Sequence, residues 1–486
     1  MLTDTLPTII QGGMGAGVSD WRLARAVSIT GQLGVVSGTA LDVIIARRLQ
    51  MGDLGGHVRR ALAAFPIAGV ADGILRRHFI PGGKACNAPF KSKPLPSERP
   101  SRAALELLVA SSFVEVFLAR EGHNGPVGIN FLEKIQATLL PSLYGAMLAG
   151  VSCVLVGAGI PRSIPGALDR FARGEPAEIT LDVKGATSDD HFGTRLCPSE
   201  LWPTGASSPA LARPAFFAIV SSATLATMLV KKSNGRVDGF IVEGPSAGGH
   251  NAPPRGPLRL TEFGEPIYSD RDLPDLEEFR RLGLPFWLAG SYARPERVVE
   301  ALRCGATGVQ VGTAFAYCDE SGLTPEIKRQ TLAMSRAKTL RVFTDPVASP
   351  TGFPFKLVQL PGTLADPATP GRAARVCDLG YLRHAYKQPD GSLGWRCPAE
   401  PVEDFTSKGG GESESRGRQC LCNALLANIG LEQVRGEAVQ TRELPLVTSG
   451  DDVIDVARFV QPGSDSYSAA DVIEYLLRGT TALNVN

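Results

Sequence analysis

The chain has 486 residues, with 50 basic and 49 acidic side chains, a formal net charge of +1 and a mean hydropathy of +0.02. This balance excludes a disordered or membrane-embedded chain, and also one whose main partner is nucleic acid, because that surface is bound through an excess of Lys and Arg. The apolar runs are too short to span a bilayer, and no basic segment followed by an apolar one begins the chain. We therefore expect a cytoplasmic protein that binds neither membranes nor nucleic acid.

Eight short apolar runs alternate with longer helical patterns, and most of the runs end in a glycine cluster. Continuous hydrophobicity is typical of strands buried on both faces, and strand–helix repetition predicts parallel pairing. Eight such units within about 310 residues predict an α/β fold, a closed (β/α)8 TIM barrel, with an open doubly wound sheet as the alternative. The runs are 7–13 (PTIIQGG), 33–38 (LGVVSG), 126–131 (PVGINF), 151–157 (VSCVLVG), 216–222 (FFAIVSS), 239–245 (GFIVEGP), 285–291 (PFWLAGS) and 308–314 (GVQVGTA).

Helical patterns follow several of these runs. Residues 19–31 predict a helix with Ser19 as its cap. Residues 294–304 predict another, with Pro295 near its start and Gly305 just beyond its end. Two further helices are predicted nearer the C-terminus, at 325–337 and 469–478.

Three segments fall outside the strand–helix repeat. Residues 76–102 are rich in Pro, Lys and Arg and predict a long loop, and residues 174–214 predict an insertion with a small β-ribbon. Each insertion could reach the active-site face of the barrel, or could be a decorative or oligomer-forming loop. We therefore divide the chain into a barrel at 1–320 and an irregular, partly helical C-terminal extension at 321–486 that packs on it.

The most informative segment is 242–250 (VEGPSAGGH), directly after the sixth apolar run. A strand that breaks into small residues lets backbone amides and one imidazole approach a flat ligand closely. His250 is thereby the candidate proton-transfer residue, although a histidine in a glycine loop is by itself more often a cap or a solvated turn residue. The other candidate binding residues of this segment are Glu243, Ala247, Gly248 and Gly249.

Small, hydrogen-bonding residues also end the seventh and eighth runs, at 288–292 (LAGSY) and 309–314 (VQVGTA). In a (β/α)8 barrel the loops after strands seven and eight form the usual phosphate site, so we expect a phosphorylated cofactor. The donors at the remaining strand ends suit the edge of an isoalloxazine ring better than a metal ion. The candidates at these ends are Ala289, Gly290, Ser291, Gly312 and Thr313 for the phosphate, and Gln11, Gly12, Gly13, Met14, Asn130, Gly157, Ser221 and Ser222 elsewhere.

These motifs resemble the pattern of the nitronate monooxygenase family, formerly called 2-nitropropane dioxygenases. The family also contains FMN-dependent enoyl-thioester reductases and an acyl-carrier-protein dehydrogenase/isomerase branch. The resemblance rests on IIQGGMG, GIN, VEGPSAGGH, AGS and GVQVGTAF, and covers roughly residues 7–320 without the insertions. It implies a barrel with noncovalent FMN at its carboxyl face and His250 as the proton-transfer residue beside the flavin. It also implies that the 11–14 turn packs on the ring, that Asn130 bonds the ring or the substrate, and that Gly290, Ser291, Gly312 and Thr313 hold the phosphate.

Two enzymatic functions follow from the resemblance. One is oxidation of a small nitronate-like compound with FMN and molecular oxygen. The other is an enoyl-thioester reductase or an acyl-carrier-protein dehydrogenase/isomerase, which the loop 349–356 (SPTGFPFK), the C-terminal cysteines and the basic loop 76–102 favour, because Lys and Arg would steer an acidic carrier protein. The intact GGH disfavours a third interpretation, a noncatalytic flavin-binding protein. We expect a homo-oligomer in either enzymatic case.

Four of the nine cysteines, at positions 377, 397, 420 and 422, gather in the extension. Such a group suggests a metal site, and the dehydrogenase/isomerase branch of the family resembles it in having a [4Fe–4S] cluster bound by C-terminal cysteines. The spacing departs from that branch's tighter grouping, and C-x-C also lacks the C-x-x-C spacing of zinc knuckles. A [4Fe–4S] cluster, a zinc ion and plain reduced cysteines therefore stay open for Cys377, Cys397, Cys420 and Cys422. Packing roles are expected for Cys153, Cys304 and Cys318.

Overall fold

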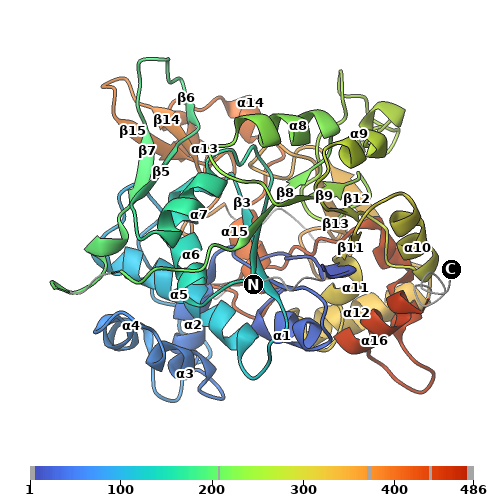
Figure 1. The fold of residues 1–486 in the computed structure, drawn as a ribbon, viewed down its shortest axis with the longest axis horizontal. Helices are drawn as coiled ribbons and strands as arrows, with labels where there is room; N and C mark the ends of the chain where they lie inside the picture. The colour runs from blue at the N-terminus through green and yellow to red at the C-terminus, as the bar shows by residue number, and fades with distance from the viewer. Residues whose placement is uncertain (1–5, 206–207, 369–374, 437–440, 479–486) are drawn as a thin grey trace.

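The computed structural model describes residues 6–205, 208–368, 375–436 and 441–478 (Figure 1). Eight parallel strands form one sheet in the order β1-β11-β10-β9-β8-β4-β3-β2. A parallel bridge between Ile10 and Leu33 joins the two ends of this order, and the Gln11 N–H donates to the Leu33 carbonyl at 2.9 Å. The sheet is thus closed, and the predicted (β/α)8 barrel is confirmed. Its strands are β1 (Ile9–Gln11), β2 (Gly34–Ser37), β3 (Val127–Leu132), β4 (Cys153–Gly157), β8 (Ala215–Val220), β9 (Gly239–Glu243), β10 (Phe286–Ala289) and β11 (Gly308–Val311).

The continuous apolar runs are explained by burial on both faces of this sheet. One set of side chains fills the inside of the barrel, where Trp287 packs against Phe217 with ring centroids 4.9 Å apart. The indole N–H of Trp287 donates to the Pro7 carbonyl at 2.8 Å, so its one polar group is satisfied. Cys153 belongs to the same inner cluster, which confirms its packing role. The opposite faces pack beneath the surrounding helices.

Helices cover the outside of the barrel. Helix α1 (Trp21–Ile29) begins two residues after the predicted cap, because the Asp20 carboxylate accepts from the N–H groups of Arg22 and Leu23. Ser19 is instead turned inward, so its prediction as the cap was wrong. The predicted helix after β10 is confirmed as α10 (Pro295–Arg303). The others of this part are α2 (Leu41–Gln50), α3 (His57–Ala63), α4 (Val70–His78), α5 (Arg102–Arg120), α6 (Gln136–Leu148), α7 (Ile164–Ala172), α8 (Ala223–Lys232), α9 (Leu276–Arg281) and α11 (Thr313–Ala316).

The two segments predicted as insertions, 76–102 and 174–214, have different structures. The second contains the predicted ribbon, in which β5 (Ala177–Thr180) pairs antiparallel with β7 (Gly193–Leu196). The first follows α4 as a long loop without helix or strand until α5 begins. Two of its cations bind within the chain: Lys93 forms an ion pair with Asp42 at 2.7 Å, and the Lys84 ammonium donates to the Ala88 carbonyl at 2.7 Å.

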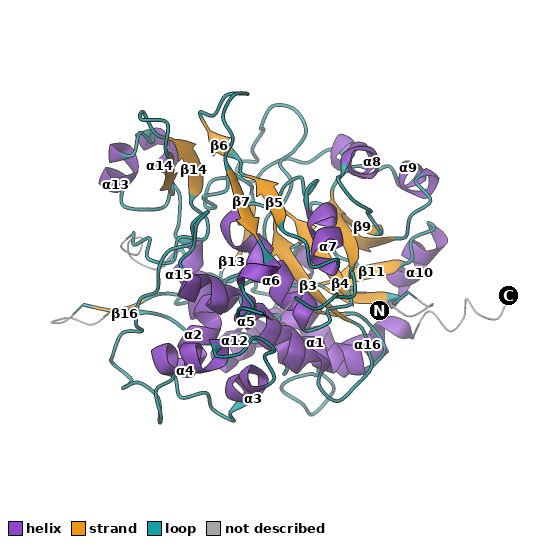
Figure 2. Cartoon of the chain, turned by 60° about the vertical axis from the view of Figure 1, so that its left-hand side comes forward, coloured by secondary structure: helices purple, strands orange, loops and turns teal. Residues whose placement is uncertain are grey.

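The extension packs against the barrel at several places. Helix α16 (Ala469–Leu477) packs on α1 and α10, and the small sheet β15-β14-β6 lies with α13 and α14 apart from the barrel strands (Figures 1 and 2). None of the described helices is long and apolar enough to cross a membrane. The remaining elements are α12 (Pro325–Arg336), β12 (Val342–Asp345), β13 (Phe355–Val358), β6 (Val183–Lys184), β14 (His384–Lys387), β15 (Leu393–Arg396), α13 (Val402–Ser407), α14 (Glu412–Ser415), α15 (Leu421–Ala427), β16 (Val434–Arg435), β17 (Thr441–Arg442) and 3-10 helices at Pro198–Glu200, Asp270–Asp272 and Asp451–Phe459.

Candidate active site

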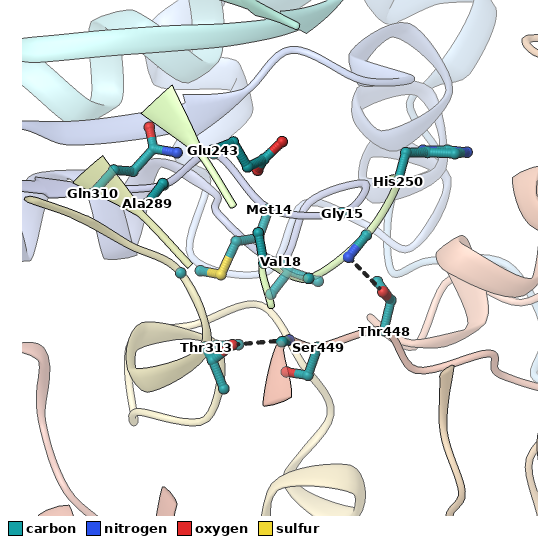
Figure 3. Close-up of a pocket in the computed structure, with 18 of the residues that line it drawn as sticks. Met14, Gly15, Val18, Glu243, His250, Ala289, Gln310, Thr313, Thr448 and Ser449 are labelled. Atoms are coloured by element: carbon teal, nitrogen blue, oxygen red, sulfur yellow. Dashed lines mark hydrogen bonds between the residues drawn. The ribbon is translucent and has the colours of Figure 1, made fainter. Parts of the chain in front are cut away.

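A cavity of about 220 Å³ opens at the carboxyl ends of the barrel strands (Figure 3). The strand ends meet there because all eight strands are parallel, so residues far apart in the chain share one wall. Most of the residues predicted from the sequence line it. They are Gly12, Gly13, Met14, Asn130, Gly157, Glu243, Ala247, Gly248, Gly249, His250, Ala289, Gly290, Ser291, Gly312 and Thr313.

Three predicted binding residues lie elsewhere. The amide of Gln11 faces the seam between β1 and β2, where its oxygen accepts from the Val35 N–H at 2.9 Å and its nitrogen donates to the Ser19 hydroxyl at 2.9 Å. Ser222 is the N-cap of α8 and accepts from the Leu225 N–H. Ser221 lines a second cavity beside the first. The side chains of Gln11 and Ser222 thus form local hydrogen bonds, and their predicted ligand role stays a prediction.

The glycines of the site allow very close packing of backbone on backbone. A Cβ atom added to Gly13 would come within 2.4 Å of the Asn130 Cβ, and one added to Gly248 within 2.6 Å of the Gly450 nitrogen. Gly290 has a φ of +100°, in the region that favours glycine, and turns the chain at the end of β10. These positions keep the cavity open and bring backbone amides to its surface.

Two side-chain amides in the wall have unused hydrogen-bonding capacity. The Oδ1 atom of Asn130 and the Oε1 atom of Gln310 are buried and have no partner within the described part of the chain. Both residues line the cavity. A buried amide oxygen without a partner is costly, so a polar ligand with N–H or O–H groups would stabilise this wall.

His250 stands at the border between the cavity and the extension. Figure 3 shows its ring directed away from Met14. The Nε2 atom lies 2.6 Å from the Ser349 hydroxyl, and the ring centroid is 4.7 Å from that of Phe355. Burial lowers the pKa of His250 to about 4, so the imidazole is neutral near pH 7.

Glu243 is the second ionisable group of the wall, at the carboxyl end of β9. Burial raises its pKa to about 7, and it borders both the main cavity and the second one. The second cavity also has about 220 Å³ and includes Arg255 and Tyr268. A carboxyl group with this pKa exchanges a proton near neutral pH.

The extension supplies a wall that the sequence analysis did not predict. Thr448 and Gly450 bind the two glycine-rich turns directly, since the Gly249 N–H donates to Thr448 Oγ1 and the Gly450 N–H to Thr313 Oγ1, each at 3.0 Å. The signal in the sequence was the run of small residues at 448–450, which resembles the strand-end motifs of the barrel. None of the described residues of the two insertions lines this cavity. The extension's lining residues are Leu323, Phe355, Leu425, Asn428, Val447, Thr448, Ser449, Gly450 and Asp452.

The four cysteines of the extension also meet, at a separate small cavity of about 10 Å³. Cys397 is buried, and Cys377, Cys420 and Cys422 are partly buried. Across the described ranges, no three His, Cys, Asp or Glu side chains already stand in an arrangement that would hold a metal ion. The structure thus brings the predicted cysteines to one place without testing what they bind.

Comparisons with known proteins relate this chain to nitronate monooxygenases. Residues 207–349, which include β8 to β11 and the 242–250 segment, match the family model described as nitronate monooxygenase. A nitronate monooxygenase of Pseudomonas aeruginosa is 27% identical over 203 residues, which is 41% of this chain and 52% of that protein. The chain therefore spans about half the length of the curated relative that it matches.

Solved structures with a similar course of the chain were also found. FabK from Thermotoga maritima has a TM-score of 0.49 at 15% identity, covering 99% of this chain and 96% of that one. Nitroalkane oxidase from Streptomyces ansochromogenes has a TM-score of 0.47 at 15% identity, covering 99% of both chains. The family model and the curated relative together confirm the resemblance that the motifs indicated.

Proposed function

We propose that this chain, a relative of the nitronate monooxygenase family, is an FMN-dependent oxidoreductase. It would oxidise an activated carbon compound such as a nitronate. The observation that carries the proposal is the cavity at the carboxyl ends of the strands, where the ordered glycine motifs meet His250. In (β/α)8 barrels this face holds the active site. The barrel interior, by contrast, is packed with apolar side chains and offers no binding space of its own.

The wall of the cavity suits FMN in two places. Gly290 and Ser291 after β10, and Gly312 and Thr313 after β11, occupy the position where such barrels bind phosphate. The unpartnered amide oxygen of Asn130 would accept from an N–H of a bound ring. When bound, FMN would supply the electron transfer, and the chain would position the substrate and handle its proton.

His250 is the proposed proton-transfer residue. Its neutral imidazole accepts a proton from a carbon acid, and the hydrogen bond with Ser349 fixes the orientation of the ring. A nitronate is already deprotonated, so no proton has to leave it. Its negative charge would instead raise the pKa of His250 and favour the imidazolium as an electrostatic partner.

The test of this role is His250→Ala. The variant should retain FMN, because the predicted phosphate contacts stay in place, but lose turnover by about a hundredfold or more. His191 is exposed in the second insertion, outside the cavity, so His191→Ala is a matched control that should change neither property. Unchanged turnover in His250→Ala would remove His250 from the mechanism.

The substrate class is tested by anaerobic mixing. We expect propionate 3-nitronate to bleach the flavin absorbance of the purified protein, and a crotonyl or decanoyl thioester to leave it unchanged. Bleaching by the saturated decanoyl thioester alone would favour the alternative of a carrier-protein dehydrogenase/isomerase. Reoxidation by the crotonyl thioester of flavin that has first been reduced with dithionite would favour an enoyl reductase, because an enoyl thioester accepts electrons. A colourless protein that takes up no added FMN would refute both.

A further inference from the structure

We propose that Cys377, Cys397, Cys420 and Cys422 bind a single zinc ion as four thiolates. The site would be structural, and it would hold the wall that the extension contributes to the main cavity. It does not depend on the proposed oxidoreductase activity, because the ligands lie outside the cavity that would take FMN.

The first support is that three separate segments bring their thiols to one place. Cys377 comes from the loop before β14, Cys397 directly follows β15, and Cys420 and Cys422 stand at the start of α15. The side chains of Cys377 and Cys397 interact with each other. Cys422 interacts electrostatically with all three of the other thiols. Four thiols thus line one small cavity whose other walls are largely apolar, as they would at a metal site.

The second support comes from the polar groups that face the sulfurs. The Asn423 side-chain nitrogen donates to the Cys420 sulfur at 3.7 Å. The guanidinium of Arg383 interacts with Cys377, Cys397 and Cys422. Binding of Zn²⁺ releases four thiol protons and leaves a centre with two negative charges, which the Arg383 cation would partly offset.

The size of the cavity favours a single ion over a cluster. A volume of about 10 Å³ accommodates about one water-sized sphere, and therefore a single ion. A four-iron, four-sulfide cube is several times larger and would have to displace the apolar residues that complete the wall, such as Leu379, Leu382 and Leu421. A tetrahedral ion with four sulfurs at about 2.3 Å would require the cysteine side chains to move inward from their present positions, in which no three of the described ligand side chains hold a metal ion.

The proposed zinc site lies next to segments that line the main cavity or contact His250. Pro350, which lines the cysteine cavity, follows Ser349, the hydrogen-bond partner of His250. The Gln419 N–H donates to the Ala348 carbonyl at 2.9 Å, so the segment before α15 is tied to the same loop. Helix α15 then carries Leu425 to the main cavity. An ion that joins these segments would stabilise the extension's side of that cavity.

The experiment measures metal in the purified full-length chain. We expect about one zinc per chain by elemental analysis, after the protein has been expressed with zinc added and dialysed. Replacement by Co²⁺ should give the intense near-ultraviolet sulfur-to-cobalt absorption and the visible bands of a tetrahedral site. These readouts require neither flavin nor turnover.

The test variant carries Cys420→Ser and Cys422→Ser together. The matched control is Cys304→Ser, because Cys304 lies in the barrel outside the site. The double variant should lose at least tenfold in metal content and in the cobalt absorption, and Cys304→Ser should keep both. Wild-type protein that holds less than a tenth of an equivalent of zinc and gives no cobalt absorption would overturn the proposal, even if the double variant failed to fold. Four irons with acid-labile sulfide would also overturn it, in favour of a cluster.

Discussion

The two ionisable residues of the cavity make opposite predictions for the pH dependence of stability. Burial lowers the pKa of His250 from 6.5 to about 4 and raises that of Glu243 from 4.5 to about 7. Each change of about 2.5 in pKa corresponds to about 3 kcal/mol. The folded chain takes up a proton on His250 less readily than the unfolded chain. The stability due to a neutral His250 is therefore present above pH 6.5 and lost as the pH falls toward 4.

The sign is reversed for Glu243. The folded chain keeps the proton on this carboxyl more readily than the unfolded chain, so its contribution is full below pH 4.5 and is lost as the pH rises through 7. In the wild-type chain the two effects largely cancel between pH 4.5 and 6.5. Each single substitution should expose the effect of the other residue.

The assay is the free energy of unfolding in urea, measured on flavin-free protein at several pH values from 4.5 to 7.5. Relative to wild type, Glu243→Gln should gain about 3 kcal/mol as the pH rises over this range, and His250→Asn should lose about 2 to 3 kcal/mol. The double variant should run parallel to wild type over the middle of the range. Curves of both single variants that stay parallel to wild type would refute the burial argument.

Three further predictions concern how the cavity is held together. Gly248→Val places side-chain atoms against the Gly450 nitrogen and should lower the retained flavin, measured by absorbance, by at least tenfold. The control is Gly244→Ala, which should retain its flavin because the added Cβ would meet no atom closer than 3.7 Å. Ser349→Ala removes the hydrogen bond to His250 and should lower kcat about tenfold with flavin content unchanged, and Ser349→Thr should recover part of the loss; equal kcat would contradict this. Asp451→Asn removes the ion pair with buried Lys356 and should cost about 1 kcal/mol, kept low because the Asp451 carboxylate is half exposed, and an unshifted urea midpoint would contradict it.

The barrel was predictable because its strands are buried on both faces. This burial requires continuous apolar runs, and the turn residues after parallel strands must share one edge, so Asn130 and Gly290 could be placed at one cavity from the sequence. The roles of Ser19 and Gln11 were not predictable in the same way. The Gln11 amide donates to the Ser19 hydroxyl, and only the tertiary structure shows that these two side chains meet.

The wall made by the extension is harder to predict, since nothing in a linear sequence says where a long irregular segment returns to. Thr448 follows β11 by more than a hundred residues, and its small-residue run is a weak signal without the hydrogen bonds it makes to the barrel. The cysteines are an intermediate case. Their number suggested a site, but only the convergence of β15, α15 and the loop before β14 on one cavity brings them together.

Hydrogen bonds link the barrel at 1–320 to the extension at 321–486 on both sides of the cavity. The extension's 448–450 segment holds the turn of His250 through Gly249 and the predicted phosphate turn through Thr313, so the two halves of the proposed FMN site are bridged by it. Farther along, the Tyr467 hydroxyl donates to the Ala314 carbonyl at 2.6 Å. A barrel cut after residue 320 would lose these partners and expose the apolar surface of α1 and α10 that α16 covers. The extension thus completes the wall of the barrel's cavity, and residue 320 does not separate two parts that are independent of each other there.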